Sequence, residues 1–179
     1  MLYQAAPLPP HTYAIGANIT DPTASPINFA SLAFDDVLHK FTLSINDSLS
    51  QFGSMAFVSA LAVDYTDVDD RIRVRRVTGD VRHVRFSDRD GVPTSDFDFL
   101  FKIGSGRDRL TSGESVSWIS RNFDINDLGT SASPFALRVQ GITSPGSMLL
   151  AKDSLEMDVA TAYLRGLPFP WCPSLKVMP

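Results

Sequence analysis

Six arginines lie within sixteen residues of this chain, in the stretch RIRVRRVTGDVRHVRF that covers residues 71–86. A guanidinium group donates hydrogen bonds in a planar fork that matches carboxylates and phosphates. The first three arginines alternate with Ile72 and Val74, so they share one face of a β-strand. Thr78-Gly79-Asp80 then predicts a hairpin turn. The stretch therefore predicts a basic β-ribbon whose candidate charged contacts are Arg71, Arg73, Arg75, Arg82 and Arg85.

Three interpretations of this ribbon stay open. Phosphate contacts would make it a nucleic-acid surface, with binding that weakens steeply as salt rises. Aspartates flank the ribbon on both sides, so the arginines can equally form a solvated sheet face, which is the interpretation that we favour. A charged contact between subunits is the third. The net charge of −4 and the isoelectric point near 5.2 argue against a nucleic-acid module, so we do not expect nucleic acid as a partner.

Clustered carboxylates are a second candidate for chemistry, because Ca²⁺ binds oxygen ligands. DYTDVDD at 64–70 and DRDG at 88–91 gather such groups, but neither has the distal glutamate of an EF-hand loop. We expect polar turns at both places, with a calcium site at Asp64–Asp70 or Asp88–Asp90 as the alternative. Three histidines and one cysteine, without zinc-ligand spacing, favour no metal site. We therefore expect no metal and no cofactor.

Catalytic signatures are missing from the sequence. It contains no nucleophile elbow, no glycine-rich phosphate loop and no cysteine–histidine pair. Asp96 and Asp98 would lie about 7 Å apart if they shared a strand face, but the phenylalanines around them fit a sheet edge as well as an acid/base pair. The sequence therefore predicts that the protein is not an enzyme and has no catalytic residues.

The elements that position these residues are predicted to be β-strands. Apolar residues alternate at period two or gather with β-branched and aromatic residues in five stretches, at 40–45, 55–63, 96–103, 114–120 and 134–142. Turn sequences separate these stretches. Many short strands at this spacing predict an all-β fold, specifically an antiparallel β-sandwich with a possible jelly-roll connection.

The two ends of the chain differ from the middle. Nine of the twelve prolines lie in residues 1–28 and 166–179, so both ends are predicted to be extended arms. We expect an N-terminal arm at 1–28, a sandwich domain at 29–150, and a short helix followed by a proline-rich arm at 151–179. The helix is expected at about 153–165, because Gly166 and Pro168 would end it.

The arms carry apolar side chains that need a surface to cover them, either on the domain itself or on a neighbouring subunit. No apolar run is long enough to span a membrane, and no signal peptide is recognisable at the amino terminus. We therefore expect synthesis in the cytoplasm and no membrane partner. The candidate subunit contacts are Leu2, Tyr3, Pro9, Phe169, Trp171 and Met178.

Two motifs resemble a known family. RLTSGESVSWIS at 109–120, followed by PFALRVQGI at 134–142, is similar to consecutive strands of bacterial extracellular β-domains that carry a PEP-CTERM sorting tail. FTLSI and MAFVSALAVDY resemble other strands of those domains, so the resemblance covers about residues 29–147. It implies an all-β structural module associated with a surface or matrix, and it carries over no catalytic residues. Neither the signal peptide nor the sorting tail of that family is found in this sequence.

These features together predict a non-enzymatic structural protein of a larger assembly, such as a virion or phage-particle component that decorates a capsid or is a minor capsid protein. Its partners would be protein subunits, either copies of itself in a homo-oligomer or a larger shell. The alternative is a carbohydrate- or surface-binding module that uses Trp118, although the alternation around Trp118 favours a place in the core.

Overall fold

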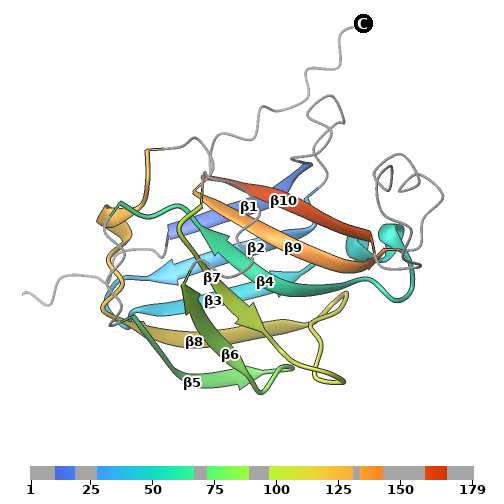
Figure 1. The fold of residues 1–179 in the computed structure, drawn as a ribbon, viewed down its shortest axis with the longest axis horizontal. Coiled ribbons are helices and arrows are strands. Elements are labelled where there is room, and N and C mark those ends of the chain that lie inside the picture. The colour runs from blue at the N-terminus through green and yellow to red at the C-terminus, as the bar shows by residue number, and fades with distance from the viewer. Residues whose placement is uncertain are drawn as a thin grey trace, which may run out of the picture.

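The computed structural model describes residues 11–18, 28–66, 72–88, 97–130, 134–142 and 160–168 (Figure 1). The strands are β1 (His11–Asn18), β2 (Ala30–Asp35), β3 (Lys40–Ile45), β4 (Phe57–Val63), β5 (Arg73–Gly79), β6 (Val84–Asp88), β7 (Phe99–Ile103), β8 (Ser115–Arg121), β9 (Phe135–Ile142) and β10 (Ala160–Pro168). Two short 3₁₀ helices accompany them, η1 (Asp47–Phe52) and η2 (Ile125–Asp127). The all-β class predicted from the sequence is confirmed. Within these ranges, no helix has the length and apolar character that crossing a membrane requires.

The strands pair in one continuous antiparallel order, β5-β8-β3-β2-β1-β10-β9-β4-β7-β6. The sheet is rolled, so that β10, β9, β4 and β7 lie in front of β1, β2, β3 and β8 in Figure 1. Its two end strands, β5 and β6, come back beside each other at the bottom of that view. No ladder joins β5 to β6 among the described residues, so the roll stays open along this line.

The core lies between the two halves of the roll. In β3 and β8 every second residue is buried, as expected for strands with one face on a core. Phe41 of β3 stacks on Trp118 of β8, with ring centroids 5.1 Å apart. The same ring meets Phe101 of β7 at 5.4 Å and Phe135 of β9 at 6.4 Å, both on the opposite half. Burial of each large ring contributes about 1.5–3 kcal/mol, so these aromatic contacts hold the two halves together.

One part of the predicted alternation is wrong. Strict alternation over the predicted stretch 96–103 would place Phe97 on the same face as Phe99, but the strand begins only at Phe99. Phe97 instead packs in a second, smaller cluster with Leu100 and three alanines of β4 and β9. The carboxylate of Asp98 accepts a hydrogen bond from the backbone N–H of Tyr65 at 2.8 Å. Asp98 therefore fixes the end of β4, and Asp96, with which it was weighed as a pair, lies outside the described residues.

The prediction of a short C-terminal helix at about 153–165 is wrong for residues 160–165, which the structure describes. Residues 160–168 form β10, which pairs with β9 on one side and with β1 on the other. Ladders on both sides satisfy much of the backbone of this segment, and such tertiary pairing readily overrides a weak helical spacing. Gly166 and Pro168, taken as helix stop signals, are paired at the end of β10 with Ile15 and Tyr13.

The predicted N-terminal arm also contains a strand. β1 lies inside residues 1–28 and is a central strand, paired with β2 and β10. Tyr13 and Ile15 alternate on its buried face, with exposed fractions of 7% and 0%. Both segments that were interpreted as arms therefore supply neighbouring strands to the middle of the sheet.

Candidate functional site

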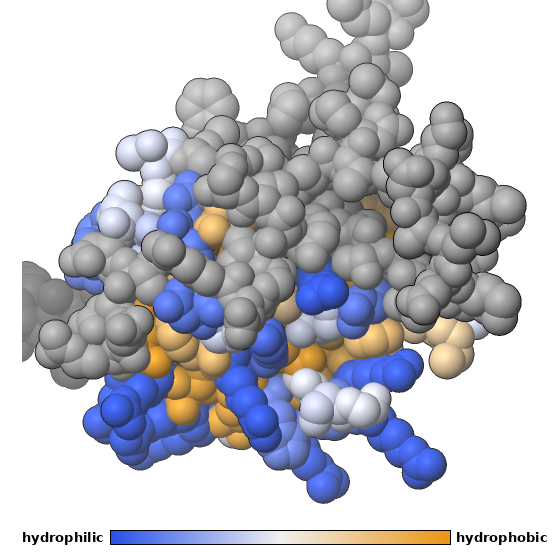
Figure 2. All heavy atoms as spheres, in the orientation of Figure 1, coloured by the Kyte–Doolittle hydropathy of each residue, from blue (hydrophilic) through white to orange (hydrophobic). Residues whose placement is uncertain are grey.

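A groove of about 720 Å³ lies along the open line between β5 and β6. Three apolar side chains of these strands pack against the core beneath it. Figure 2 shows hydrophilic side chains along this edge with hydrophobic residues between them. We call this feature the arginine groove, and its lining residues are Arg73, Val74, Arg75, Arg76, Val84, Arg85, Phe86 and Arg121.

A bulge in β5 sets the direction of its arginines. Arg73 pairs with Arg121 of β8 and Arg75 with Ile119, but the register then shifts before Thr78. Arg76 adopts a φ of 50°, which is uncommon for a residue with a side chain. A bulge of this kind re-aims side chains at a sheet edge. It explains how the consecutive residues Arg75 and Arg76 both line the groove.

The groove carries positive charge that the described residues do not neutralise. None of its five arginines forms an ion pair with another described residue, and the two ion pairs within the described ranges, at His11 and His83, lie elsewhere. Arg73 and Arg121 stand directly opposite each other on β5 and β8. Like charges at directly opposite positions destabilise a sheet. The arrangement therefore favours a negatively charged partner in the groove.

The structure brings together part of the predicted set of charged residues. Arg73, Arg75 and Arg85 line the groove as one site, whereas Arg82 lies in the turn between β5 and β6 and Arg71 lies outside the described residues. Sequence reasoning missed two members, Arg76 and Arg121. The break in alternation after Arg75 was a usable signal for Arg76. Arg121 gave no signal, because only the pairing of β8 with β5 brings it here.

Other predicted residues have separate outcomes. Trp118 is fully buried, so it cannot contact a carbohydrate and the alternative function loses its main residue. The calcium alternatives stay untested, since Asp67–Asp70 and Asp90 lie outside the described residues, and no three metal-ligating side chains gather within the described ranges. The contact residues predicted for the two ends also lie outside: Leu2, Tyr3, Pro9, Phe169, Trp171 and Met178.

One titratable group with a large shift lies away from the groove, at the end of β4. The hydroxyl of Tyr65 donates to Asp127 at 3.2 Å and accepts from the backbone N–H of Asp124 at 3.0 Å. Burial raises the pKa of Tyr65 to about 12; the hydrogen bond from Asp124 opposes this shift, and the negative charge of Asp127 adds to it. Tyr65 therefore fastens η2 to the sheet as a neutral phenol.

No protein-family model, curated protein or solved structure matches the chain. The resemblance to PEP-CTERM domains therefore stays a prediction.

Proposed function

We propose that the protein is a non-enzymatic structural protein of a larger assembly, which binds an acidic, extended segment of a protein partner in the arginine groove. One observation carries this proposal: five arginines that form no ion pair with another described residue line a groove between the two end strands of the sheet. Arginine is well suited to such a contact, because its fork binds carboxylates with two parallel hydrogen bonds.

The strand edges support an extended ligand. β5 and β6 are the two ends of the strand order, so each has a side without a ladder among the described residues. An added peptide strand uses such backbone groups for affinity and alternate side-chain pockets for specificity. The apolar floor of Val74, Val84 and Phe86 would receive every second side chain of the ligand. The preferred segment would alternate acidic and apolar residues.

The described surface favours a protein over a nucleic acid. Binding of single strands relies on exposed aromatic rings on which bases stack. The large hydrophobic residues exposed in the described ranges are Val37, Leu38 and Met55, and the one aromatic ring that lines the groove, Phe86, is half-buried. The overall charge of −4 would also repel a long polyanion away from the groove.

The finer parts of the proposal concern architecture and location. We take the two halves of the roll as the layers of a β-sandwich, with jelly-roll connections as the untested variant. A virion or phage particle, with the protein as a decoration or minor capsid component, is the assembly that we propose. Self-association in a homo-oligomer, helped by the apolar ends of the chain, belongs to the same proposal. Native mass measurement at high protein concentration tests it, and a strict monomer would contradict the homo-oligomer.

The binding test uses a short fluorescent peptide of alternating Asp and Val, with its Lys–Val counterpart as the control. We expect the acidic peptide to bind at low salt, and Arg75→Gln and Arg85→Gln each to weaken binding about tenfold, because each removes a charge-assisted contact. Arg107→Gln is the matched control, since Arg107 is exposed and does not line the groove.

Three results would overturn the proposal. The acidic peptide would show no low-salt binding, or the two groove variants would bind it as well as Arg107→Gln does. Tighter binding of a labelled oligothymidylate than of the peptide would also overturn it, because the groove would then be a nucleic-acid site.

A further inference from the structure

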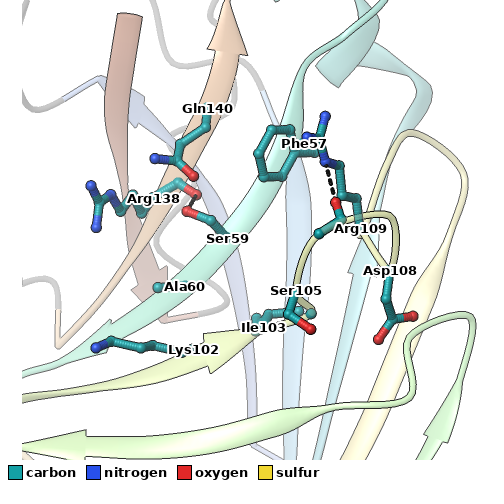
Figure 3. A pocket seen from close by; sticks show the side chains of 12 residues that line it. Phe57, Ser59, Ala60, Lys102, Ile103, Ser105, Asp108, Arg109, Arg138 and Gln140 are labelled. Carbon is teal, nitrogen blue, oxygen red and sulfur yellow. Dashed lines mark hydrogen bonds between the residues drawn. The ribbon is translucent and has the colours of Figure 1, made fainter. Parts of the chain in front are cut away.

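A second hollow lies on the outer face of β4, β7 and β9, beside the connection between β7 and β8 (Figure 3). Its volume is about 300 Å³, at the lower end of the range for small-ligand pockets. It shares no lining residue with the arginine groove. A ligand bound in this hollow would therefore be independent of any partner in the arginine groove.

The strand register explains why the surface is hollow here. Ala60 of β4 is the pairing partner of Arg138 on β9 and of Lys102 on β7. A small side chain thus stands between two long cationic ones, whose Cα atoms are about 10 Å apart across two strand spacings. Figure 3 shows the ends of both long side chains on the same side of Ala60. Two positive charges therefore flank one shallow depression.

Arg138 has a hydrogen-bond donor without an acceptor. Its Nε atom is buried and has no hydrogen-bond acceptor among the residues that the structure describes. Its backbone carbonyl is engaged, because Ser59 Oγ donates to it at 3.3 Å. Buried hydrogen-bond donors almost always have an acceptor in folded proteins. A buried donor without one is therefore a candidate contact for a ligand. An acceptor that enters the hollow would satisfy this donor.

The carboxylate that lines the hollow is already committed elsewhere. Burial tends to raise the pKa of Asp108, but hydrogen bonds from His83 and from the backbone N–H of Arg82 outweigh it and lower the pKa. Asp108 therefore stays ionised at the rim. Arg109 is also fixed, since its Nε donates to the carbonyl of Gly106 at 2.8 Å. The cations of the hollow outnumber its one acid by three to one.

We propose that this hollow binds a small molecule through a carboxylate or phosphate group, held between the guanidinium of Arg138 and the ammonium of Lys102. Both groups donate hydrogen bonds only, so the ligand must supply the acceptors. Gln140 and Ser59 line the same hollow and would contact hydroxyl groups of the ligand. The chemical class is a small hydroxylated oxyanion, such as a sugar acid or a sugar phosphate.

The experiment measures the thermal midpoint of the full chain with glucuronate, with inorganic phosphate, or with glucose, at ionic strength matched by sodium chloride. At tenfold excess over Kd, a bound anion should raise the midpoint by about 3–6 °C. We expect at least one anion to do so and glucose to have no effect. The two anions distinguish a carboxylate ligand from a phosphate ligand.

Variants locate the effect. Arg138→Gln and Lys102→Gln should both lose the rise in midpoint, while Arg107→Gln and Arg85→Gln should keep it. Lys102 is exposed, so its variant folds even if Arg138→Gln does not. Phosphate also stabilises proteins non-specifically by exclusion from their surface, and the Lys102→Gln variant controls for this effect.

Three results would overturn the inference. Neither anion would raise the midpoint above the chloride control, or the Lys102→Gln variant would keep the full rise. The third is a rise that Arg85→Gln removes and Lys102→Gln retains, which would place the anion in the arginine groove.

Discussion

Reversing one charge of the arginine groove should make the protein more stable. Arg73 and Arg121 are directly opposite on β5 and β8, and both are exposed. Arg121→Glu replaces a like-charge pair with an opposite-charge pair at the same position. In the proposed function, the repulsion between these arginines lowers stability but provides the positive charge that binds an acidic partner. The variant should therefore gain stability and lose binding of the acidic peptide.

The size of this effect follows from the geometry. Paired Cα atoms in an antiparallel ladder are about 5 Å apart, and two long side chains can spread their charges to about 7 Å. At that separation the Coulomb energy in water is about 0.6 kcal/mol. Changing its sign alters the free energy of unfolding by about 1.2 kcal/mol at low salt. Screening should reduce the gain to about 0.5 kcal/mol at physiological salt and almost abolish it at 1 M salt.

Urea denaturation at low, physiological and 1 M salt measures the gain, and the thermal midpoint should rise by about 3 °C at low salt. Arg121→Gln should give about half of the gain, because it removes repulsion without adding attraction. Arg107→Glu serves as the control at an exposed site outside the groove. A gain that is equal at all salt concentrations, or a loss of stability at low salt, would refute the electrostatic reasoning.

Three further predictions concern the fold. Phe41→Ala, which removes the ring shared by both halves of the roll, should lower the free energy of unfolding by about 3–5 kcal/mol in urea denaturation. The raised pKa of Tyr65 means that the folded state holds the phenol proton more tightly than the unfolded state does. As pH rises from about 10 to about 12, the wild type should therefore lose stability that a Tyr65→Phe variant does not lose. Urea denaturation of both proteins across that pH range measures the difference. Gly141→Ala should cost more in thermal melts than Gly106→Ala: their φ angles are 73° and 60°, but only at Gly141 would a Cβ atom collide with the carbonyl of Met55.

Local pattern was sufficient for the strands of the core. The hairpin predicted at Thr78-Gly79-Asp80 is wrong, because β5 pairs with β8 and β6 pairs with β7 rather than with each other. The predicted stretch at 40–45 has the bounds of β3, and the alternation that places Trp118 inside holds in β8. These strands have one buried and one solvated face, so apolar and polar residues alternate along their sequences.

Long-range pairing accounts for what the sequence did not reveal. β10 has neighbours on both sides, and its stability comes from β1 and β9 rather than from its own residue pattern. β1 does alternate at Tyr13 and Ile15, but nearby prolines made the whole segment look like an arm. Arg121 joins the groove only through a ladder with a strand more than forty residues earlier. These features depend on which strands pair with each other, and a single sequence gives little information about long-range strand pairing.

The pairing of β1 with β10 has a consequence for biosynthesis. The earliest and the latest described strands are neighbours in the middle of the sheet, so a nascent chain that has not yet released β10 has no bridge between its two halves. Until then β1 and β9 each offer a bare edge to other chains. Productive folding must therefore wait until residues 160–168 are available to pair, and contacts of such high sequence separation form slowly. We expect early release from the ribosome, or loss of residues 160–168, to yield aggregates rather than a smaller folded domain.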